Sequence, residues 1–169
     1  RTLRLAYAEW EDHLTSARPH PALHRAWMMF VLQQTLELPD TVLAQGQAIS
    51  QTLKATIAEH GETLRPDLVV HTPAQAGTAR LLIQTYPPGQ PLEKSIPRKH
   101  WKASPATRMM ELLHATEVRL GLVTNGEHWM LVDAPRGDTT GFASWYAHLW
   151  LEEPVTLRAF QSLLRVSRF

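Results

Sequence analysis

Two apolar runs near the middle of the chain carry polar side chains of the kinds that bind metal ions and phosphate groups. Asp67 stands at the head of the run Leu68-Val69-Val70, and the run Leu81-Leu82-Ile83 continues into Gln84 and Tyr86. Residues i and i+2 of a strand face the same side of a sheet, so we expect Gln84 and Tyr86 to point the same way. The spacing therefore predicts a small polar site where the two runs meet.

The chemistry that such a layout can perform depends on which residues fill it. Two carboxylates can hold Mg²⁺, which polarises a scissile phosphate and lowers the pKa of a bound water, and a nearby lysine supports the developing charge. Here Asp67 supplies one carboxylate, and Gln84 and Tyr86 are neutral. Gln can bind a metal only through its amide oxygen, and Tyr does not replace an ammonium group. These three residues alone therefore supply neither a second carboxylate nor an ammonium group.

Two alternatives remain open for these positions. Nearby groups could restore the missing chemistry if the fold brings them to Asp67; the candidates for such a migrated site are Glu59, Glu62, Glu93 and Lys94. In the other alternative Asp67 only accepts backbone N–H bonds after Pro66, and Gln84 and Tyr86 are ordinary strand residues. In that case Asp67 binds no metal, and the polar site has a structural role.

The first sixty residues are predicted to be helical. Apolar residues recur at helical spacing from Leu3 to Leu14, and a second apolar segment covers residues 23–36 and stops before Pro39. A third helix is expected from Asp40, as N-cap, to about Glu59, with Gly61 suited to the C-cap. These segments make up a predicted N-terminal helical segment, residues 1–61.

The remainder alternates between strands and helices. Residues 68–70 and 80–86 are predicted to pair as a hairpin, and Ser104-Pro105 is a typical helix start for a helix that runs to about Thr116. A second hairpin is expected around Asn125-Gly126 in a type I′ turn, and two helices over about 144–151 and 156–165. This order predicts an α/β (α+β) fold with a mixed sheet flanked by helices.

Composition limits the classes of protein to consider. At 169 residues, with 44% hydrophobic and 20% charged residues, the chain has the size and balance of one soluble domain. It contains no cysteine, which excludes disulfides and thiolate zinc sites and suits a reducing cytoplasm. We expect residues 1–61 and 62–169 to form one compact domain cut from a larger protein, because the chain begins without Met and stops in mid-pattern. No apolar run is long enough to span a membrane.

Positive charge gathers in the segment from Lys94 to Arg108, which covers the end of the loop after the first predicted hairpin and the first turn of the helix at Pro105. Five basic residues lie there with no acid among them, together with Trp101: Lys94, Arg98, Lys99, Lys102 and Arg108. Lys and Arg release counterions from DNA, and an aromatic ring can stack on a base or sugar. We therefore consider Arg98, Lys99, Trp101, Lys102 and Arg108 as candidate DNA-binding residues, with a solvated basic loop as the alternative.

The order strand with Asp67, strand, helix, strand resembles the core of the PD-(D/E)XK nuclease fold. The chain is similar to the N-terminal region of type IIG, Eco57I-like restriction–modification methyltransferases and related phage-defence proteins. The resemblance covers about residues 64–169, and it depends on Leu64-Arg65-Pro66-Asp67, Leu81-Leu82-Ile83, Ser104-Pro105-Ala106-Thr107-Arg108 and Leu120-Gly121-Leu122-Val123-Thr124-Asn125-Gly126. The last of these also looks like the Leu-Thr-Asn-Gly strand and turn of type I restriction subunits.

The resemblance implies a restriction-endonuclease-like fold, a DNA partner and a DNA methyltransferase as the parent protein. It implies Mg²⁺ at Asp67 if the site is active, and S-adenosylmethionine only in a parent domain beyond Phe169, because this chain has no Gly-rich loop for that cofactor. Proteins of this family have Glu and Lys at the positions that match Gln84 and Tyr86, so the resemblance implies that most of the catalytic chemistry is lost. The expected function is an inactive nuclease-like domain that contacts DNA or serves as architecture. The alternatives are an active Mg²⁺-dependent endonuclease with a migrated site and a module that docks other domains of its parent protein.

Overall fold

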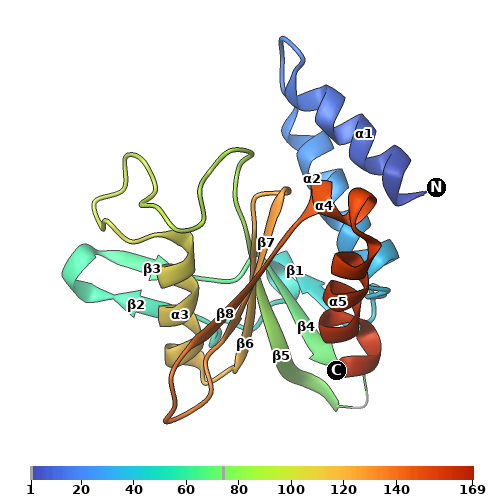
Figure 1. The fold of residues 1–169 in the computed structure, drawn as a ribbon. Helices are drawn as coiled ribbons and strands as arrows, with labels where there is room; N and C mark the ends of the chain where they lie inside the picture. Colours follow the sequence, from blue (N-terminus) through green and yellow to red (C-terminus); the bar gives the residue numbers. More distant parts are fainter. Residues whose placement is uncertain (1, 74) are drawn as a thin grey trace.

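A mixed β-sheet with helices on both faces organises the protein (Figure 1). The computed structural model describes residues 2–73 and 75–169, and within these residues the main sheet has six strands in the order β1-β4-β5-β6-β7-β8. Their bounds are Leu43–Gln45 (β1), Leu68–Thr72 (β4), Gln75–Thr85 (β5), Leu120–Thr124 (β6), His128–Asp133 (β7) and Gly141–Tyr146 (β8). A separate two-stranded hairpin consists of β2 (Ala55–Ile57) and β3 (Glu62–Leu64).

The two predicted hairpins are confirmed. β4 and β5 pair antiparallel with Leu68 opposite Ile83, and β6 and β7 pair antiparallel with Thr124 opposite Trp129. β5 and β6 are parallel, and helix α3 (Pro105–Thr116) lies in the long connection between them, since parallel neighbours need a crossover. Ser104 caps α3 as predicted, because its hydroxyl accepts the N–H of Thr107.

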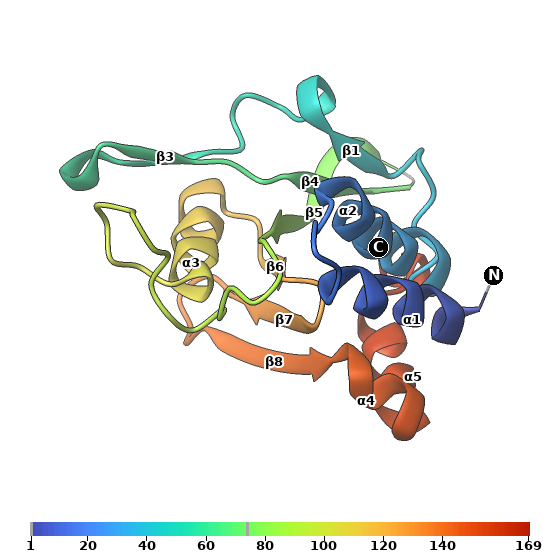
Figure 2. The same ribbon diagram turned by 90° about the horizontal axis from the view of Figure 1, so that it is seen from above.

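Two hydrophobic clusters fill the two sides of the sheet. On one side α1 (Leu3–Leu14), α2 (Pro21–Phe30, continued by a π-helical turn over Val31–Thr35), α4 (Ala147–Glu152) and α5 (Pro154–Leu164) pack against the strands. α3 and the β2–β3 hairpin cover the other side (Figure 2). The central strand β5 contributes to both, because Leu81 and Ile83 face the first cluster and Leu82 faces the second.

The predicted third helix is wrong. Residues 40–59 form β1, β2 and two 3₁₀ turns. Their apolar side chains do not share one stripe, because Leu43 packs in the cluster of the four helices whereas Ile49 and Ala55 pack in the cluster under α3. Pairing of β1 with β4, with Leu43 opposite Val70, overrides the helical spacing.

Two further predictions about local structure need correction. The expected helix over 144–151 begins only at Ala147, because the preceding residues form the edge strand β8 against β7. The turn after β6 is not type I′, since only Gly126 has a positive φ, of 95°. Instead the Asn125 side-chain oxygen accepts the N–H groups of Glu127 and His128 and closes the turn.

No helix among the described residues is both long enough and apolar enough to cross a lipid bilayer. The longest continuous helix among the described residues is α2 with its π-helical turn, over 10 and 5 residues in succession. A bilayer-spanning helix needs roughly 20.

The close contact between α3 and β6 generates the first prediction. A Cβ at Gly121 would lie 2.4 Å from the Met109 sulfur and 3.2 Å from Leu113 Cδ1, whereas a Cβ at Gly141 would meet no atom within 4 Å. We expect Gly121→Ala to lower the free energy of unfolding by about 1–3 kcal/mol, because a well-packed core resists an added methyl group. Gly141→Ala is the matched control, and urea unfolding followed by circular dichroism measures both. Equal stability of the two variants would contradict this packing.

Candidate functional site

A polar pocket of about 250 Å³ opens on the α3 side of the sheet, where the start of β4 meets the end of β5. It brings together residues that the sequence places far apart. They come from the β2–β3 hairpin, from β4 and β5 and the residues beside them, from α3, and from the loop between β5 and α3, residues 86–104, which we call the basic loop. The titratable and polar side chains that line it include Glu62, Asp67, Gln84, Tyr86, Lys99 and Arg108. All three motif positions, one migrated-site candidate and two predicted DNA-binding residues therefore converge.

Asp67 is held by the neighbouring strand. Its Oδ2 accepts a hydrogen bond of 2.8 Å from the Thr85 N–H and one of 3.3 Å from the Thr85 hydroxyl. The side chain reaches solvent at the pocket rim, yet the surrounding protein removes enough water to raise the pKa of its carboxyl, against the opposing effects of Thr85 and Arg25. Asp67 therefore accepts a backbone N–H, the contact that the structural alternative expects of it, with Thr85 as the donor.

Gln84 lies across the strand pair from Asp67 on the same face of the sheet. The residue is only 6% exposed, and its side-chain nitrogen donates to the Arg65 carbonyl at 3.3 Å. Its side-chain oxygen is buried and has no hydrogen-bond partner among residues 2–73 and 75–169. A buried acceptor without a hydrogen bond costs free energy. The Gln84 side-chain oxygen therefore destabilises the fold locally, at the position where the resemblance expects a carboxylate.

Tyr86 ends β5 on the same face as Gln84. Burial raises the pKa of its hydroxyl to about 12, so the side chain is neutral at physiological pH. Its backbone carbonyl accepts a 2.8 Å hydrogen bond from the ring of His24 in α2, and its N–H donates to the Thr124 carbonyl at 2.8 Å. The residue therefore supplies no positive charge to the pocket.

Arg108 lies in the protein interior, and this corrects its prediction as a residue of an exposed DNA-binding surface. It is 3% exposed, and its guanidinium forms an ion pair with Glu62 at 2.5 Å and donates to the carbonyls of Trp101 (2.9 Å) and Ala103 (3.2 Å). Arg108 lines the pocket, and its guanidinium N–H groups already donate to Glu62, Trp101 and Ala103. Arg108 lowers the pKa of the Glu62 carboxyl through this contact.

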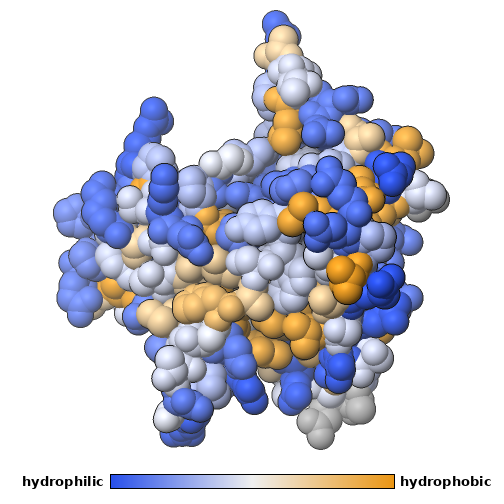
Figure 3. All heavy atoms as spheres, viewed as in Figure 1, coloured by the Kyte–Doolittle hydropathy of each residue, from blue (hydrophilic) through white to orange (hydrophobic). Residues whose placement is uncertain are grey.

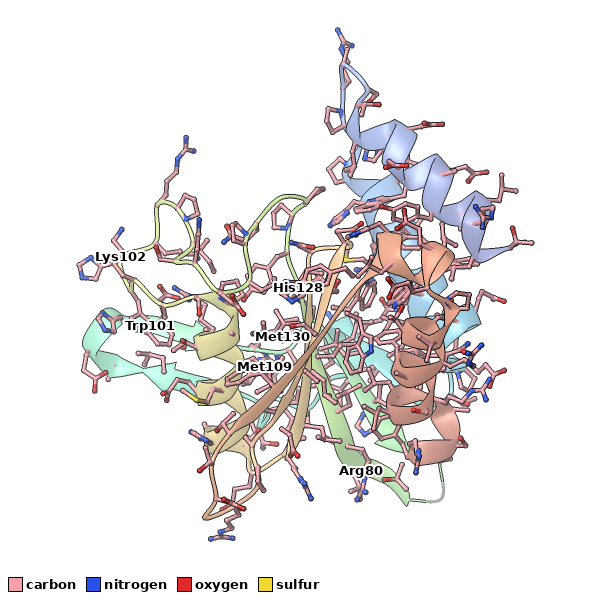
Figure 4. All side chains as sticks on the ribbon, in the orientation of Figure 1. Arg80, Trp101, Lys102, Met109, His128 and Met130 are labelled. Carbon is pink, nitrogen blue, oxygen red and sulfur yellow. The ribbon has the colours of Figure 1, made fainter. Side chains whose placement is uncertain are left out.

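Trp101 also has protein partners on its ring. The ring lies nearly parallel to His60, at an interplanar angle of 16° and a centroid distance of 5.6 Å, and the Arg108 guanidinium lies 4.7 Å from its centroid. Figure 4 shows Trp101 and Lys102 at the far end of the molecule, beside the β2–β3 hairpin. The ring joins the basic loop to that hairpin, which conflicts with the predicted stacking on a base.

The remaining basic residues of the loop are exposed, as predicted. Within the described part of the chain, none of the following forms an ion pair: Lys94, Arg98, Lys99 and Lys102. Lys99 also lines the pocket and lies close enough to Glu62 to lower the pKa of its carboxyl further. The loop thus offers free cations directly beside the polar pocket.

The migrated-site candidates do not assemble around Asp67. Glu62 lines the pocket but is bound by Arg108, and Glu59, Glu93 and Lys94 lie outside it. Among residues 2–73 and 75–169 no three His, Asp or Glu side chains are placed to hold one metal ion. Besides Glu62, the pocket offers the Asp67 carboxylate, which accepts hydrogen bonds from Thr85, and the neutral amide oxygen of Gln84. It therefore carries less negative charge than a site with two free carboxylates.

In comparisons with known proteins, no family model, no curated protein and no solved structure matches this chain. The function of the pocket must therefore be argued from its own geometry and from the residue pattern of the sequence.

The Arg108–Glu62 pair generates the second prediction. We expect Glu62→Gln to lower the free energy of unfolding by about 1–3 kcal/mol at neutral pH, since a buried cation loses its counter-charge. The pKa of Glu62 is lowered in the folded state, so its stabilising effect is present above the unfolded pKa and disappears as pH falls through the lowered folded pKa. Urea unfolding from pH 7 to acid measures the difference between variant and wild type, which should shrink in that window. The exposed Glu59→Gln is the control and should unfold like the wild type at each pH.

The Asp67–Gln84 pair generates the third prediction. Gln84→Glu places a second carboxylate opposite Asp67, where Cβ atoms of paired residues lie about 5 Å apart. We expect Mn²⁺ to raise the melting temperature of this variant and to leave the wild type unchanged, because binding to the folded state stabilises it. Gln51→Glu, on an exposed turn, is the matched control. An equal Mn²⁺ effect on the wild type would show that its own residues already hold a metal.

Proposed function

We propose that this chain is a nuclease-like domain of a restriction–modification or phage-defence DNA methyltransferase, and that it contacts DNA without cleaving it. The observation that carries the proposal is the polar pocket itself. Asp67 and Gln84 meet on one face of paired strands, at the positions where the resemblance to PD-(D/E)XK nucleases expects two carboxylates.

The order of elements supports the same interpretation. The strand that follows Asp67, its antiparallel partner β5, the crossover helix α3 and the parallel strand β6 lie in one sheet in the order that the resemblance requires. α3 covers the face on which the pocket opens, so the loop between β5 and α3 passes beside the pocket. The restriction-endonuclease-like fold is part of the proposal on these grounds.

The loss of catalysis is inferred from three side chains. Gln84 is neutral, Tyr86 is neutral, and the nearby carboxylate of Glu62 is bound by Arg108. A metal-dependent cleavage of phosphodiesters needs a bound metal to polarise the phosphate and to activate water. The pocket keeps one carboxylate with which to attract such an ion, and that carboxylate accepts hydrogen bonds from Thr85.

The contact with DNA is assigned to the exposed cations of the basic loop, chiefly Lys99 and Lys102. Among the described residues neither lysine forms an ion pair, so both can neutralise DNA phosphates and release the counterions condensed on the DNA. Arg108 and Trp101 are left out of the DNA surface, because their contacts within the protein hold the loop in place.

DNA binding gives the fourth prediction. A gel shift across salt concentrations, without divalent metal, should show salt-dependent binding of the chain to duplex DNA. In Lys99→Ala/Lys102→Ala, binding should weaken for all sequences alike and the slope of log K against log salt should fall by about 2, because each lysine is expected to contact one phosphate. The control Arg4→Ala/Arg158→Ala removes the same charge from α1 and α5, on the other side of the sheet.

Two outcomes would contradict the proposal. Absence of salt-dependent binding, or equal loss in both double variants, would favour a module that docks other protein domains. Nicking of plasmid DNA by the parent protein with Mg²⁺ or Mn²⁺, abolished by Asp67→Ala, would show an active nuclease.

A further inference from the structure

The outer edge of the sheet at β8 is the feature that neither the pocket nor the basic loop explains. β8 ends the strand order, and Figure 2 shows it at the margin of the sheet, with α4 and α5 past its C-terminal end. Its pairing with β7 is regular over all six residues from Gly141 to Tyr146. The strand contains no charged residue and no proline, which are the devices that usually protect an edge from pairing with another chain.

The backbone groups that this edge offers can be assigned from one hydrogen bond. The Ala147 N–H donates to the Glu127 carbonyl at 2.8 Å, directly after the paired residues His128 and Tyr146. Because hydrogen-bonded and non-hydrogen-bonded pairs alternate along an antiparallel ladder, the three residues that do not bond β7 are Phe142, Ser144 and Tyr146. Their N–H and C=O groups therefore point away from the sheet.

The side chains of the same three residues lie on one face of the strand, where His128 of β7 hydrogen-bonds the Ser144 hydroxyl at 2.7 Å and stacks on the Tyr146 ring at 4.6 Å. Ala143 and Trp145 face the helical cluster, where the Trp145 ring meets Phe160 at 5.3 Å, so the alternate residues face the α3 side. α3 packs on β6 and β7, and it leaves Phe142 52% exposed and Tyr146 40% exposed. Figure 3 shows apolar surface on this side of the molecule, between α3 and α5.

We propose that β8 is the interface through which two copies of this chain associate, by antiparallel pairing of β8 with β8 of the second copy. A two-fold axis through Ser144 places Phe142 opposite Tyr146 of the second copy, and Ser144 opposite Ser144. In this register every outward N–H meets an outward carbonyl, because the three residues with outward groups face one another.

The residues of β8 fit the same strand of a second copy in this register. The register produces the pair of Phe142 with Tyr146 of the second copy twice, on the open face, and aromatic cross-strand pairs stabilise a sheet. It also places Ala143 opposite Trp145 on the other face, so that a small side chain meets a large one. No like charges meet, because the strand has none. The surface is self-complementary, as a two-fold interface requires.

The inference does not depend on DNA binding, since the polar pocket and the basic loop lie at the other end of the α3 face. A single strand and its aromatic side chains form a small interface, so we expect a reversible dimer of modest affinity. This dimer would join the two sheets into one continuous sheet.

The fifth prediction tests the register through charge at Ser144. Sedimentation of the wild type should show a concentration-dependent dimer. Ser144→Lys and Ser144→Glu should each weaken dimerisation by more than about tenfold, because two like charges then face each other. An equal mixture of the two variants should restore the dimer. Ser16→Lys and Ser16→Glu, in the exposed turn after α1, are the matched controls and should dimerise like the wild type.

Cysteine substitution gives a second readout in a chain that has no cysteine. Under mild oxidation Ser144→Cys should form a covalent dimer far faster than Ser16→Cys. Phe142→Cys should cross-link with Tyr146→Cys in a mixture and poorly with itself. A wild type that stays monomeric at its highest soluble concentration would overturn the proposal. It would also fail if the dimer tolerates Ser144→Lys, or if Ser16→Cys cross-links as fast as Ser144→Cys.

Discussion

The buried guanidinium of Arg108 is the contact on which the shape of the pocket depends. It binds Glu62 at the start of β3, the carbonyls of Trp101 and Ala103 at the end of the basic loop, and the ring of Trp101. Two elements, the β2–β3 hairpin and the end of the basic loop, are therefore fixed to the first turn of α3. A guanidinium suits this role, because its donors lie in one plane and can reach several acceptors at once. Removing either charge of such a buried pair leaves the other without compensation.

The same contact determines what the pocket can do. Glu62 is the nearest candidate for a second carboxylate, and Arg108 binds it and lowers its pKa. Asp67 is left with two hydrogen bonds from Thr85, and Gln84 turns an unpaired oxygen into the protein interior. The arrangement satisfies its charges internally, whereas a metal site must leave its carboxylates free for the ion. Beside the pocket, the basic loop carries exposed cations that form no ion pair with the described residues, Lys99 among them, which is why we propose DNA contact through that loop.

Local signals predicted the parts of the fold that local chemistry determines. Ser104 and Pro105 identified the start of α3, and two apolar runs around Asn125-Gly126 identified the β6–β7 hairpin. Residues 40–59 could not be predicted from spacing, because their apolar side chains divide between two clusters that only the folded sheet separates. β8 was missed for a related reason, since it is half-covered and its exposed face includes Phe142 and Tyr146.

The candidate site likewise combines features that local sequence signals predicted with features that depend on tertiary contacts. The convergence of Asp67, Gln84 and Tyr86 followed from strand periodicity, and the exposure of Lys99 and Lys102 followed from the proline-rich loop. The interior position of Arg108 had a signal in the sequence, because Arg108 shares the stripe of Pro105, Met109 and Leu112 on α3. Its partner Glu62 had no local signal, since the β2–β3 hairpin that carries it depends on tertiary pairing. The role of Trp101 could not be predicted either, because its ring contacts both Arg108 and His60 of the β2–β3 hairpin.

The N-terminal helices contribute to the site as well as to the core. The Trp10 side-chain N–H donates to His24, and the other ring nitrogen of His24 bonds the Tyr86 carbonyl at the end of β5. Trp27 donates to the Gly126 carbonyl at 2.7 Å, and a Cβ at Gly126 would lie within 3 Å of Trp10 and His24. The last residue of the motif is thus held from the side of the sheet opposite the pocket. The contact that fixes the strand end uses the Tyr86 backbone carbonyl, so it does not depend on which side chain stands at position 86.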